Sequence, residues 1–562
     1  MQLDFRSGGE LSVEDSMLID IIAPRVQEEY SKFIGQLISE NKLSELELLL
    51  SVISRNPFHS SVLPVLCKAL LLEKKLERGD EVTSIIVENA PISAIIYSIL
   101  DRFNRKIPVK IGNGYLHNSL FFTRLIKVFK SIYWIIISWL WPRLSGIYKA
   151  KPNTSIVFVD NFIFPNSFNK SGQFIERYYS GYDQYLNNEQ RQKIWYSPTL
   201  YGFKTLGQCL KMSAQSKESQ QNFIFQESWL TLGNYLKALH TTMKLPNKIL
   251  ITPTFMGIDI RQLLIYEARK DIFSPSLVMA ICKYYFIKKI KEANVAVCQV
   301  VDWSENQTID KALNLGFHKY YPNTVVKGYQ GYVSPLYETH KIPQPFELDS
   351  LILPDQLYVI SERYKGVVLD SCPSLDVRLA SAFRFSYLYN VNRDKFAEQD
   401  LSILIALPMD INESIGILQL CTQLPNILDG KVRILVKHHP AHNSQEFAKK
   451  VPAFLDEAFT QTQDSMFHLL ETISLLISSA SSACAEAKAV GIPVAIYGNR
   501  CGVTMNPIPN EGEGPLGNIF YSWEQLVDLV ECSLRQGDVK MSVEQYFFMD
   551  KGQSARRLFV CE

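Results

Sequence analysis

The stretch LLISSASSACAEAKAVGIPVAIYG (475–498) carries the clearest pattern in the chain. An apolar run leads into a cluster of serines, an alanine-rich helical pattern ends at Gly491, and a second apolar run follows. A strand, a helix and a strand in this order form a unit with two parallel strands in one sheet. The serines can cap the helix, and its positive dipole end favours an anion at the carboxyl end of the first strand. The stretch therefore predicts an open parallel α/β sheet with an anion site at its edge.

Short apolar runs and helical patterns alternate through the rest of this region. They predict a Rossmann-like domain over residues 396–540, with helices at 413–424 and 481–491 and strands at 402–408, 431–440, 473–479 and 492–498. The end of the chain, 541–562, is expected to be a tail or a short helix.

The same alternation occurs earlier in the chain. It predicts a second Rossmann-like domain over residues 151–395, with a helix at 276–291 and strands at 155–159, 248–251, 295–301, 324–329 and 357–360. The charged stretch 376–399 is expected to link the two domains. Residues 1–150 have apolar residues at three- and four-residue spacing, which predicts a helical N-terminal module. The fold class expected is therefore α/β, with two Rossmann-like domains.

The composition excludes several classes of protein. The chain has 562 residues, of which 47% are hydrophobic and 20% charged, as in folded proteins of two or three domains. Fifty-eight Lys and Arg against fifty-seven Asp and Glu leave no overall field to attract nucleic acid, so no nucleic-acid partner is expected. The ten cysteines are scattered and are expected to be reduced thiols. The N-terminus lacks the pattern of a secretory signal, which favours a cytoplasmic location.

Residues 119–141 combine aromatic side chains with Arg124, Lys127 and Lys130. The longest apolar run, 132–141, is well short of the ~20 residues that cross a bilayer, so no transmembrane helix is expected. Such a helix suits a membrane interface, with its aromatics at headgroup depth and its cations on anionic lipid. The alternative is a buried connecting helix whose lysines extend outward.

Two segments of the 396–540 domain are candidates for binding a phosphate. A strand ends in His438, His439 and Pro440, where an imidazole can donate a hydrogen bond to a phosphate oxygen. About forty residues later, the helix start offers its serines and backbone N–H groups to the same anion. An ordinary serine N-cap is the alternative for this second segment. The residues assigned to the helix start are Ser479, Ser481, Ser482 and Glu486.

Carboxylates at strand ends of the 151–395 domain are candidates for proton transfer. Asp160 follows one apolar strand, while Asp302 and Glu305 follow another. A carboxylate at a strand end would face the cleft between the domains, and we favour Glu305, with Asp160 and then Asp302 as alternatives. The competing interpretation for each is a helix cap or an ion pair with a neighbour such as Lys311. No D-x-D motif follows an apolar strand, so neither a metal nor another cofactor is expected.

Other polar groups near the ends of the same strands are candidates for substrate contact. Gln307 follows Glu305 closely, and the segment KGYQGY (327–332) follows the next predicted strand. Its glycines would let a ligand approach the backbone, and Tyr329 and Gln330 would contact a sugar. The simpler interpretation of this segment is a turn.

The order of these motifs resembles a known family. A strand with an HP loop, followed by a strand, two serines, a helix and G-x-P-V, is similar to the HP and S motifs of bacterial sialyl-, polysialyl- and Kdo-type transferases. Related motifs occur in the glycerophosphotransferases of teichoic acid synthesis. The segments SRNPFHSS (54–61), VDWSENQTIDKALNLGF (301–317) and KGYQGY resemble surface carbohydrate biosynthesis proteins, and the likeness spans most of residues 1–540.

The resemblance implies a GT-B fold, in which two Rossmann-like domains face each other, and a metal-independent glycosyltransferase of capsule or O-antigen synthesis. It implies a CMP-linked nonulosonic acid as donor and a glycan or lipid-linked glycan as acceptor, at the cytoplasmic face of the inner membrane. His439 would match the histidine of the HP motif, and Ser481 and Ser482 the serines of the S motif. Three alternatives stay open: a UDP, GDP or CDP donor, a hydrolysing nucleotide-sugar epimerase, and a non-catalytic assembly subunit.

Overall fold

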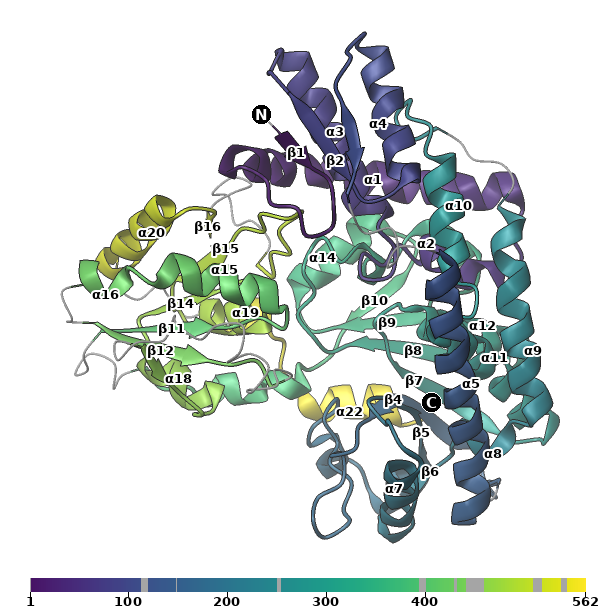
Figure 1. The fold of residues 1–562 in the computed structure, drawn as a ribbon. Coiled ribbons are helices and arrows are strands. Elements are labelled where there is room, and N and C mark those ends of the chain that lie inside the picture. Colours follow the sequence, from purple (N-terminus) through teal and green to yellow (C-terminus); the bar gives the residue numbers. More distant parts are fainter. Residues whose placement is uncertain are drawn as a thin grey trace.

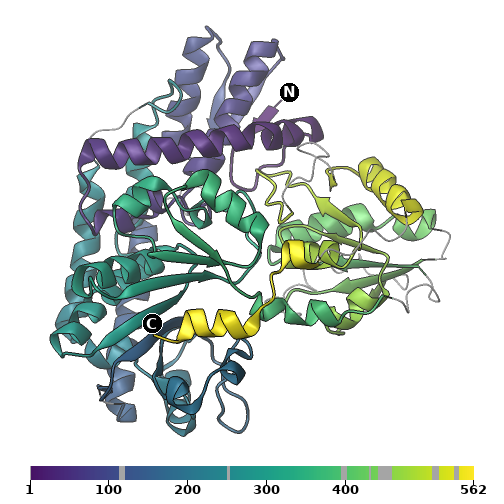
Figure 2. The same ribbon diagram turned by 180° about the vertical axis from the view of Figure 1, so that it is seen from behind.

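The computed structural model describes residues 2–112, 120–147, 149–249, 254–393, 401–428, 432–440, 459–508, 518–536 and 543–561. Two parallel sheets lie side by side, each covered by helices, and a smaller module caps one of them (Figures 1 and 2). The expected α/β class with two Rossmann-like sheets is confirmed by this strand arrangement.

The first sheet has the strand order β10-β9-β8-β7-β4-β5-β6, and all its pairs are parallel. Its strands are β4 (Ile156–Ile163), β5 (Ile194–Leu200), β6 (Asn222–Phe223), β7 (Val297–Trp303), β8 (Val325–Gln330), β9 (Gln356–Val359) and β10 (Asp376–Leu379). The central strands are buried on both faces, which explains their nearly continuous apolar runs.

Helices cover both faces of this sheet. They are α6 (Asn188–Gln192), α7 (Leu206–Glu218), α8 (Gln226–Trp229), α9 (Leu232–Lys244), α10 (Arg261–Lys270), α11 (Pro275–Glu292), α12 (Thr308–Tyr320), α13 (Pro345–Asp349) and α14 (Glu362–Ser371), with 3-10 turns η2 (Tyr182–Tyr185), η3 (Leu245–Lys248) and η4 (Thr339–Lys341). The strand expected at 248–251 is not observed at Lys248 or Ile249, and residues 250–251 lie outside the described residues.

The second sheet has the order β13-β12-β11-β14-β15-β16 and is also parallel. Its strands are β11 (Ser402–Ala406), β12 (Arg433–Lys437), β13 (Phe459–Gln461), β14 (Leu475–Ser478), β15 (Val494–Tyr497) and β16 (Ile519–Phe520), with helices α15 (Ile411–Cys421), α16 (Leu424–Ile427), α18 (Met466–Thr472), α19 (Ser482–Ala489) and α20 (Trp523–Gln536). The chain extends the sheet from β11 first to one side and then to the other. The strand order therefore reverses between β11 and β14, the position where open α/β sheets bind ligands.

The N-terminal module differs from the expected helical one. It contains α1 (Val13–Asn41), η1 (Glu47–Leu49), α2 (Ser51–Ser54), α3 (Val62–Arg78) and α4 (Ala90–Arg102), together with a parallel sheet of β1 (Gln2–Asp4), β2 (Ser84–Val87) and β3 (Val109–Ile111). Arg55 fastens this module to the first domain, because its guanidinium lies 2.9 Å from Glu347, and Lys311 lies 2.8 Å from the same carboxylate. All three side chains are buried.

The segment expected to contact a membrane forms α5 (Leu120–Ser145), a longer helix than 119–141, whose residue 119 lies outside the described residues. Among the described helices, its part Arg124–Ser145 is long and apolar enough to cross a membrane by length and composition. The estimate from the longest apolar run was therefore too strict. In the structure, α5 packs along α7, α8, α9, α10 and α11, beside the first sheet (Figure 1).

Two segments connect the domains, and one of them lies within the expected linker at 376–399, which is structured in part. Residues Asp376–Leu379 are the edge strand of the first sheet, followed by η5 (Phe383–Asn390), and 394–399 lie outside the described residues. The chain end forms α21 (Val543–Tyr546) against the second domain and α22 (Lys551–Phe559), which returns to the first domain (Figure 2). A disulfide joins Cys298 in β7 to Cys561 after α22, so the expectation of ten reduced thiols is wrong for this pair.

Candidate functional site

The two phosphate-binding segments leave the second sheet at the same edge. Ile405 pairs with both Val436 and Ile477, so the ends of β12, β11 and β14 are level. The hydroxyl of Ser478 donates to the carbonyl of Ala406 at 2.6 Å, which fixes this row. Two strand spacings separate the outer strands, or roughly 10 Å. The structure therefore brings the histidine loop and the serine-rich helix start to the same edge of the sheet.

The helix start itself is built by serines. Ser481 is the N-cap of α19, and its Oγ accepts a hydrogen bond from the backbone N–H of Ala483 at 3.3 Å. Ser482 is exposed and donates to Glu486 at 2.8 Å, and Tyr387 of η5 donates to the other oxygen of that carboxylate. Burial raises the pKa of Glu486. Glu486 therefore holds Ser482 and the connector in place.

A second carboxylate borders this edge. Ser479 is buried and donates its hydroxyl to Glu413 at the start of α15, and burial raises the pKa of Glu413. An anion that binds the backbone beside Ser479 is therefore best tolerated when Glu413 is protonated. The side chains of His438 and His439 are half-buried, while Pro440 is exposed.

Glu305 lies in the loop after β7, with its carboxylate held by two donors. Trp303 Nε1 donates to one oxygen at 2.9 Å, and Gln307 Nε2 donates to the other at 2.6 Å. The loop backbone is fixed by Asp310, whose Oδ2 accepts from the N–H groups of Glu305 and Gln307 at 3.0 and 2.9 Å. Glu305 remains partly exposed. Its position fits a proton acceptor whose orientation is set before substrate arrives.

Arg384, which sequence reasoning did not identify, lies over the ring of Trp303, the donor to Glu305. This exposed residue of η5 has its guanidinium 5.7 Å from the ring centre of Trp303. Burial raises the pKa of Glu486, and the charge of Arg384 offsets a small part of this rise, so Arg384 is within electrostatic reach of α19. Within the described residues, its guanidinium forms no hydrogen bond or ion pair. A cation in this position can bind a phosphate with both of its outer nitrogens.

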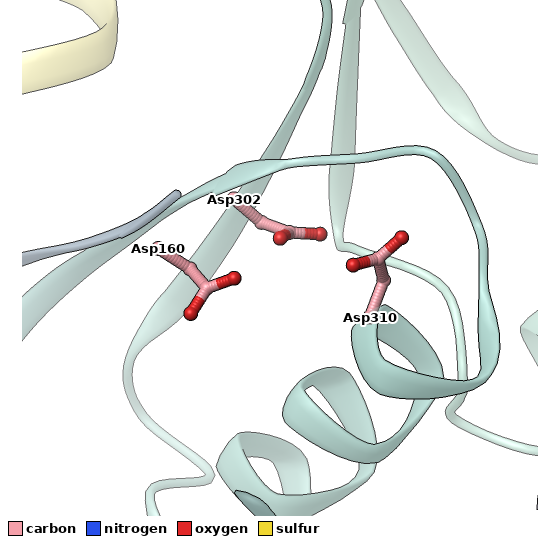
Figure 3. A group of neighbouring side chains, drawn as sticks. All are labelled: Asp160, Asp302 and Asp310. Atoms are coloured by element: carbon pink, nitrogen blue, oxygen red, sulfur yellow. The ribbon is translucent and has the colours of Figure 1, made fainter. Parts of the chain in front are cut away.

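Asp160 and Asp302 do not face the cleft between the domains, so these two predictions are corrected. Each lies inside a strand rather than after it, and Asp160 forms a buried ion pair with Lys283 at 2.6 Å. Figure 3 shows Asp160, Asp302 and Asp310 pointing toward one another, with ligand atoms within 4.8 Å of one another. Neither oxygen of Asp302 accepts a hydrogen bond from the described residues.

The three buried aspartates share a need for neutralisation. Burial raises the pKa of Asp160 and holds the pKa values of Asp302 and Asp310 well above their usual range. Lys283 supplies one positive charge against the three carboxylates. Protons or a bound cation can neutralise the negative charge that is left. Of the described side chains, these carboxylates are a group close enough to share a metal ion. Because all three are buried, substrate does not reach them.

Two residues of KGYQGY, Tyr329 and Gln330, also contribute to the packing of the domain and do not face a substrate. The ring of Tyr329 is buried, and its hydroxyl donates to the carbonyl of Ser381 at 2.7 Å. Gln330 is buried and donates to the carbonyl of Lys341 at 2.9 Å. Neither side chain can stack on or bind a sugar, and the prediction of substrate contacts there is wrong. Gln307, in contrast, is half-buried beside Glu305.

Two cavities lie near the second sheet but do not contain these residues. One of about 570 Å³ is lined by the start of α15, residues 497–501 and the N-terminal segment, with the carboxylates of Glu10, Asp410 and Glu413 and the cation Arg500. Another of about 380 Å³ lies between residues 57–65 and residues 499–505. Arg384, Glu305 and the start of α19 line neither cavity, and they are the candidate phosphate site on the chemistry of their side chains.

Two parallel Rossmann-like sheets in one chain define an α/β protein of GT-B type. No family model and no curated protein matches the chain. Among solved structures it is similar to MnaA of S. aureus in complex with UDP, at 11% identity and a TM-score of 0.38, over 72% of this chain and 94% of that one.

Two further structures are similar to this chain. One is the UDP-GlcNAc 2-epimerase of Neisseria meningitidis bound to UDP-GlcNAc, at 11% identity and a TM-score of 0.36, over 72% of this chain and 98% of that one. The other is the α,α-trehalose 6-phosphate synthase of Burkholderia multivorans, at 7% identity and a TM-score of 0.35, over 72% and 94% of the two chains. Because these sequence identities and TM-scores are low, the fold assignment rests on the strand order of the two sheets.

Proposed function

We propose that this chain is a glycosyltransferase of bacterial surface polysaccharide synthesis that takes its sugar from a nucleotide donor. The observation that carries the proposal is a series of neighbouring groups from three parts of the chain. Trp303 donates to Glu305 of the first domain, and Arg384 of the connector lies over the same tryptophan ring. The charge of Arg384 also reaches Glu486 of α19, which accepts from Ser482 at the helix start. These groups supply a proton acceptor, an exposed cation and a serine-capped helix start, a combination suited to transfer from a phosphate leaving group.

The proposed roles follow from the chemistry of each group. The phosphate lies against the start of α19, with His439 and Arg384 as donors, and the negative charge of the departing nucleotide is stabilised there. Glu305 accepts the proton of the acceptor hydroxyl. The oxygen of that hydroxyl bonds to the anomeric carbon as the bond from this carbon to the phosphate oxygen breaks. These roles use no metal ion.

The motif order favours a CMP-linked nonulosonic acid as donor, and UDP, GDP and CDP sugars are the competing donors. A product nucleotide stabilises the folded state by mass action, so thermal unfolding with each of CMP, UDP, GDP and CDP identifies the base. We expect CMP to raise the unfolding temperature and the other three to have smaller effects. Arg384→Ala should remove the shift, whereas Arg378→Ala, at an exposed arginine of β10, should keep it. A clear preference for UDP would overturn the CMP assignment.

Incubation with donor separates transfer from the alternatives. A transferase hydrolyses its donor slowly without acceptor, whereas a hydrolysing epimerase turns the donor over fully. A non-catalytic subunit does neither, and its Glu305→Gln and His439→Ala variants would leave polysaccharide production unchanged. We expect donor consumption to depend on a glycan or lipid-linked glycan acceptor.

A further inference from the structure

The outward face of α5 is an apolar stripe. Phe129 is 65% exposed and Ile136 is 51% exposed, where most large apolar side chains of the domain are buried. The exposed apolar residues recur every three or four positions and therefore lie on one side of the helix. It is made of Phe122, Leu125, Ile126, Phe129, Ile132, Tyr133 and Ile136. Contiguous apolar surface of this kind marks an interaction site.

The opposite face of α5 is fixed to the domain, so the stripe cannot turn inward. Ser131 is buried and donates to the carbonyl of Phe273 at 2.9 Å. Trp134 packs edge-on against Tyr235 of α9, and the buried Trp141 packs edge-on against Phe225. A helix crossing a bilayer would lose these contacts. The described arrangement instead leaves the helix lying along the surface with one side outward.

Positive charge surrounds the stripe. The helices α5, α7, α9 and α10 together carry eleven Lys and Arg and two acidic residues, of which Glu267 is buried. The whole chain, in contrast, has a net charge of only +1. Exposed cations of this group include Lys130 on α5 and Lys237 and Lys244 on α9, next to the exposed Leu236. An apolar stripe with flanking cations matches the headgroup region of an anionic bilayer.

We propose that the α5 stripe with its flanking cations is the docking surface for an anionic lipid membrane, on which the protein lies without inserting a spanning helix. A second copy of the chain is the less favourable occupant, since a two-fold contact would set this basic surface against itself. The surface lies on the side of the first sheet away from the second domain, so docking leaves the approach between the domains open (Figures 1 and 2). The proposal does not depend on which reaction the protein catalyses.

Vesicle sedimentation of the full-length protein, with no nucleotide added, tests this proposal. We expect the protein to sediment with vesicles of phosphatidylcholine and phosphatidylglycerol, and far less with phosphatidylcholine alone or at high salt. Ile136→Glu should reduce binding about tenfold, because it places a charge in the stripe. The matched control is Ile21→Glu, at an isoleucine of α1 that is 50% exposed, and it should bind as the wild type does. Lys237→Glu should weaken binding about fivefold, as expected for one surface cation.

Three outcomes would overturn the proposal. The wild type could stay in the supernatant with anionic vesicles, or Ile136→Glu could bind them as well as the wild type. Alternatively, light scattering could find a dimer that Ile136→Glu dissociates, which would assign the stripe to a second copy. Donor turnover in solution remains measurable for every variant, so failure of docking and failure of the proposed enzyme activity are distinguished.

Discussion

Asp302 lies near the end of β7 and Glu305 lies in the loop that follows it, yet their environments are opposite. Glu305 is partly exposed and held by Trp303 and Gln307, whereas Asp302 is buried without a described partner. Glu305→Gln keeps the shape but cannot accept a proton, and its single amide oxygen can accept from Trp303 while the Gln307 amide turns its own oxygen toward the new NH₂ group. We expect it to lower transfer about 10²- to 10⁴-fold at saturating donor, while nucleotide binding measured by thermal shift is retained. Loss of nucleotide binding together with activity would instead make Glu305 a binding residue.

Asp302→Asn is expected to stabilise the protein at neutral pH. Because the pKa of Asp302 is higher in the folded than in the unfolded state, the folded protein binds more protons, and its stability falls as pH rises above the usual aspartate range. Asparagine does not ionise and therefore avoids this loss of stability. The difference in free energy of unfolding between variant and wild type should grow from about pH 5 to about pH 8, by about 1.4 kcal/mol per unit of pKa shift. Thermal unfolding with a chelator present measures it.

The matched control for this prediction is Asp370→Asn, at an exposed aspartate of α14, which should change stability little at any pH. If Asp302→Asn is less stable than the wild type at about pH 8, Asp302 is ionised and held by a partner such as a cation. Adding Mg²⁺ or Ca²⁺ would then stabilise the wild type more than the variant.

At the scale of single elements, the start of α19 has two functions that substitution can separate. Ser481 caps the helix, and in the proposed function the same turn binds phosphate. Aspartate also caps helices well but repels an anion, whereas alanine does neither. We expect Ser481→Asp to unfold like the wild type and to lose the nucleotide-induced shift. Ser481→Ala should cost about 1 kcal/mol of stability and bind nucleotide weakly. Nucleotide binding by Ser481→Asp at wild-type strength would contradict the placement of the phosphate.

Four strands of the second sheet, β11, β12, β14 and β15, could be predicted from the sequence because their apolar runs are uniform and end at glycine, proline or serine. The edge strands β13 and β16 have only three and two residues and were not predicted. The runs of the first sheet were recognised as strands, but their ends were set too early. β4 was expected to end at Val159 and reaches Ile163, and β7 was expected to end at Val301 and reaches Trp303. These extensions carry Asp160 and Asp302 into the sheet, which is why two of the three expected carboxylates are buried.

Other elements gave no adequate local signal. β5 contains Pro198 in its middle, β10 mixes charged and apolar residues, and the three N-terminal strands have only three or four residues each. Arg384 lies in a stretch that was expected to be a plain linker. Its importance arises from Trp303 and Glu486, which approach it from distant parts of the chain, and such an approach leaves no spacing pattern in the sequence.

At the scale of the whole molecule, the two connections between the domains are joined to each other. The N–H of Ala382 donates to the carbonyl of Phe548 at 2.9 Å, and the hydroxyl of Tyr389 donates to the carbonyl of Phe547 at 2.6 Å. Any rotation of one domain against the other therefore moves both connections together. Arg384 lies within this pair of segments, so such a rotation would carry its guanidinium relative to Glu305 and α19.

The last helix makes the first domain depend on a segment that follows the second domain in the chain. The ring of Phe559 in α22 is buried against Tyr182, with ring centres 4.1 Å apart, and the backbone carbonyl of Arg557 accepts from Lys327 of β8 at 2.6 Å. Phe559→Ala should destabilise the protein by about 3–5 kcal/mol, as for other buried phenylalanines. Phe559 shares one buried apolar cluster with Leu404 and Leu476 of the second sheet, so the two domains have part of their core in common. Calorimetry should therefore show a single transition that shifts as a whole to lower temperature. A second transition that stays at its wild-type temperature would contradict this coupling and mean that the second domain unfolds on its own.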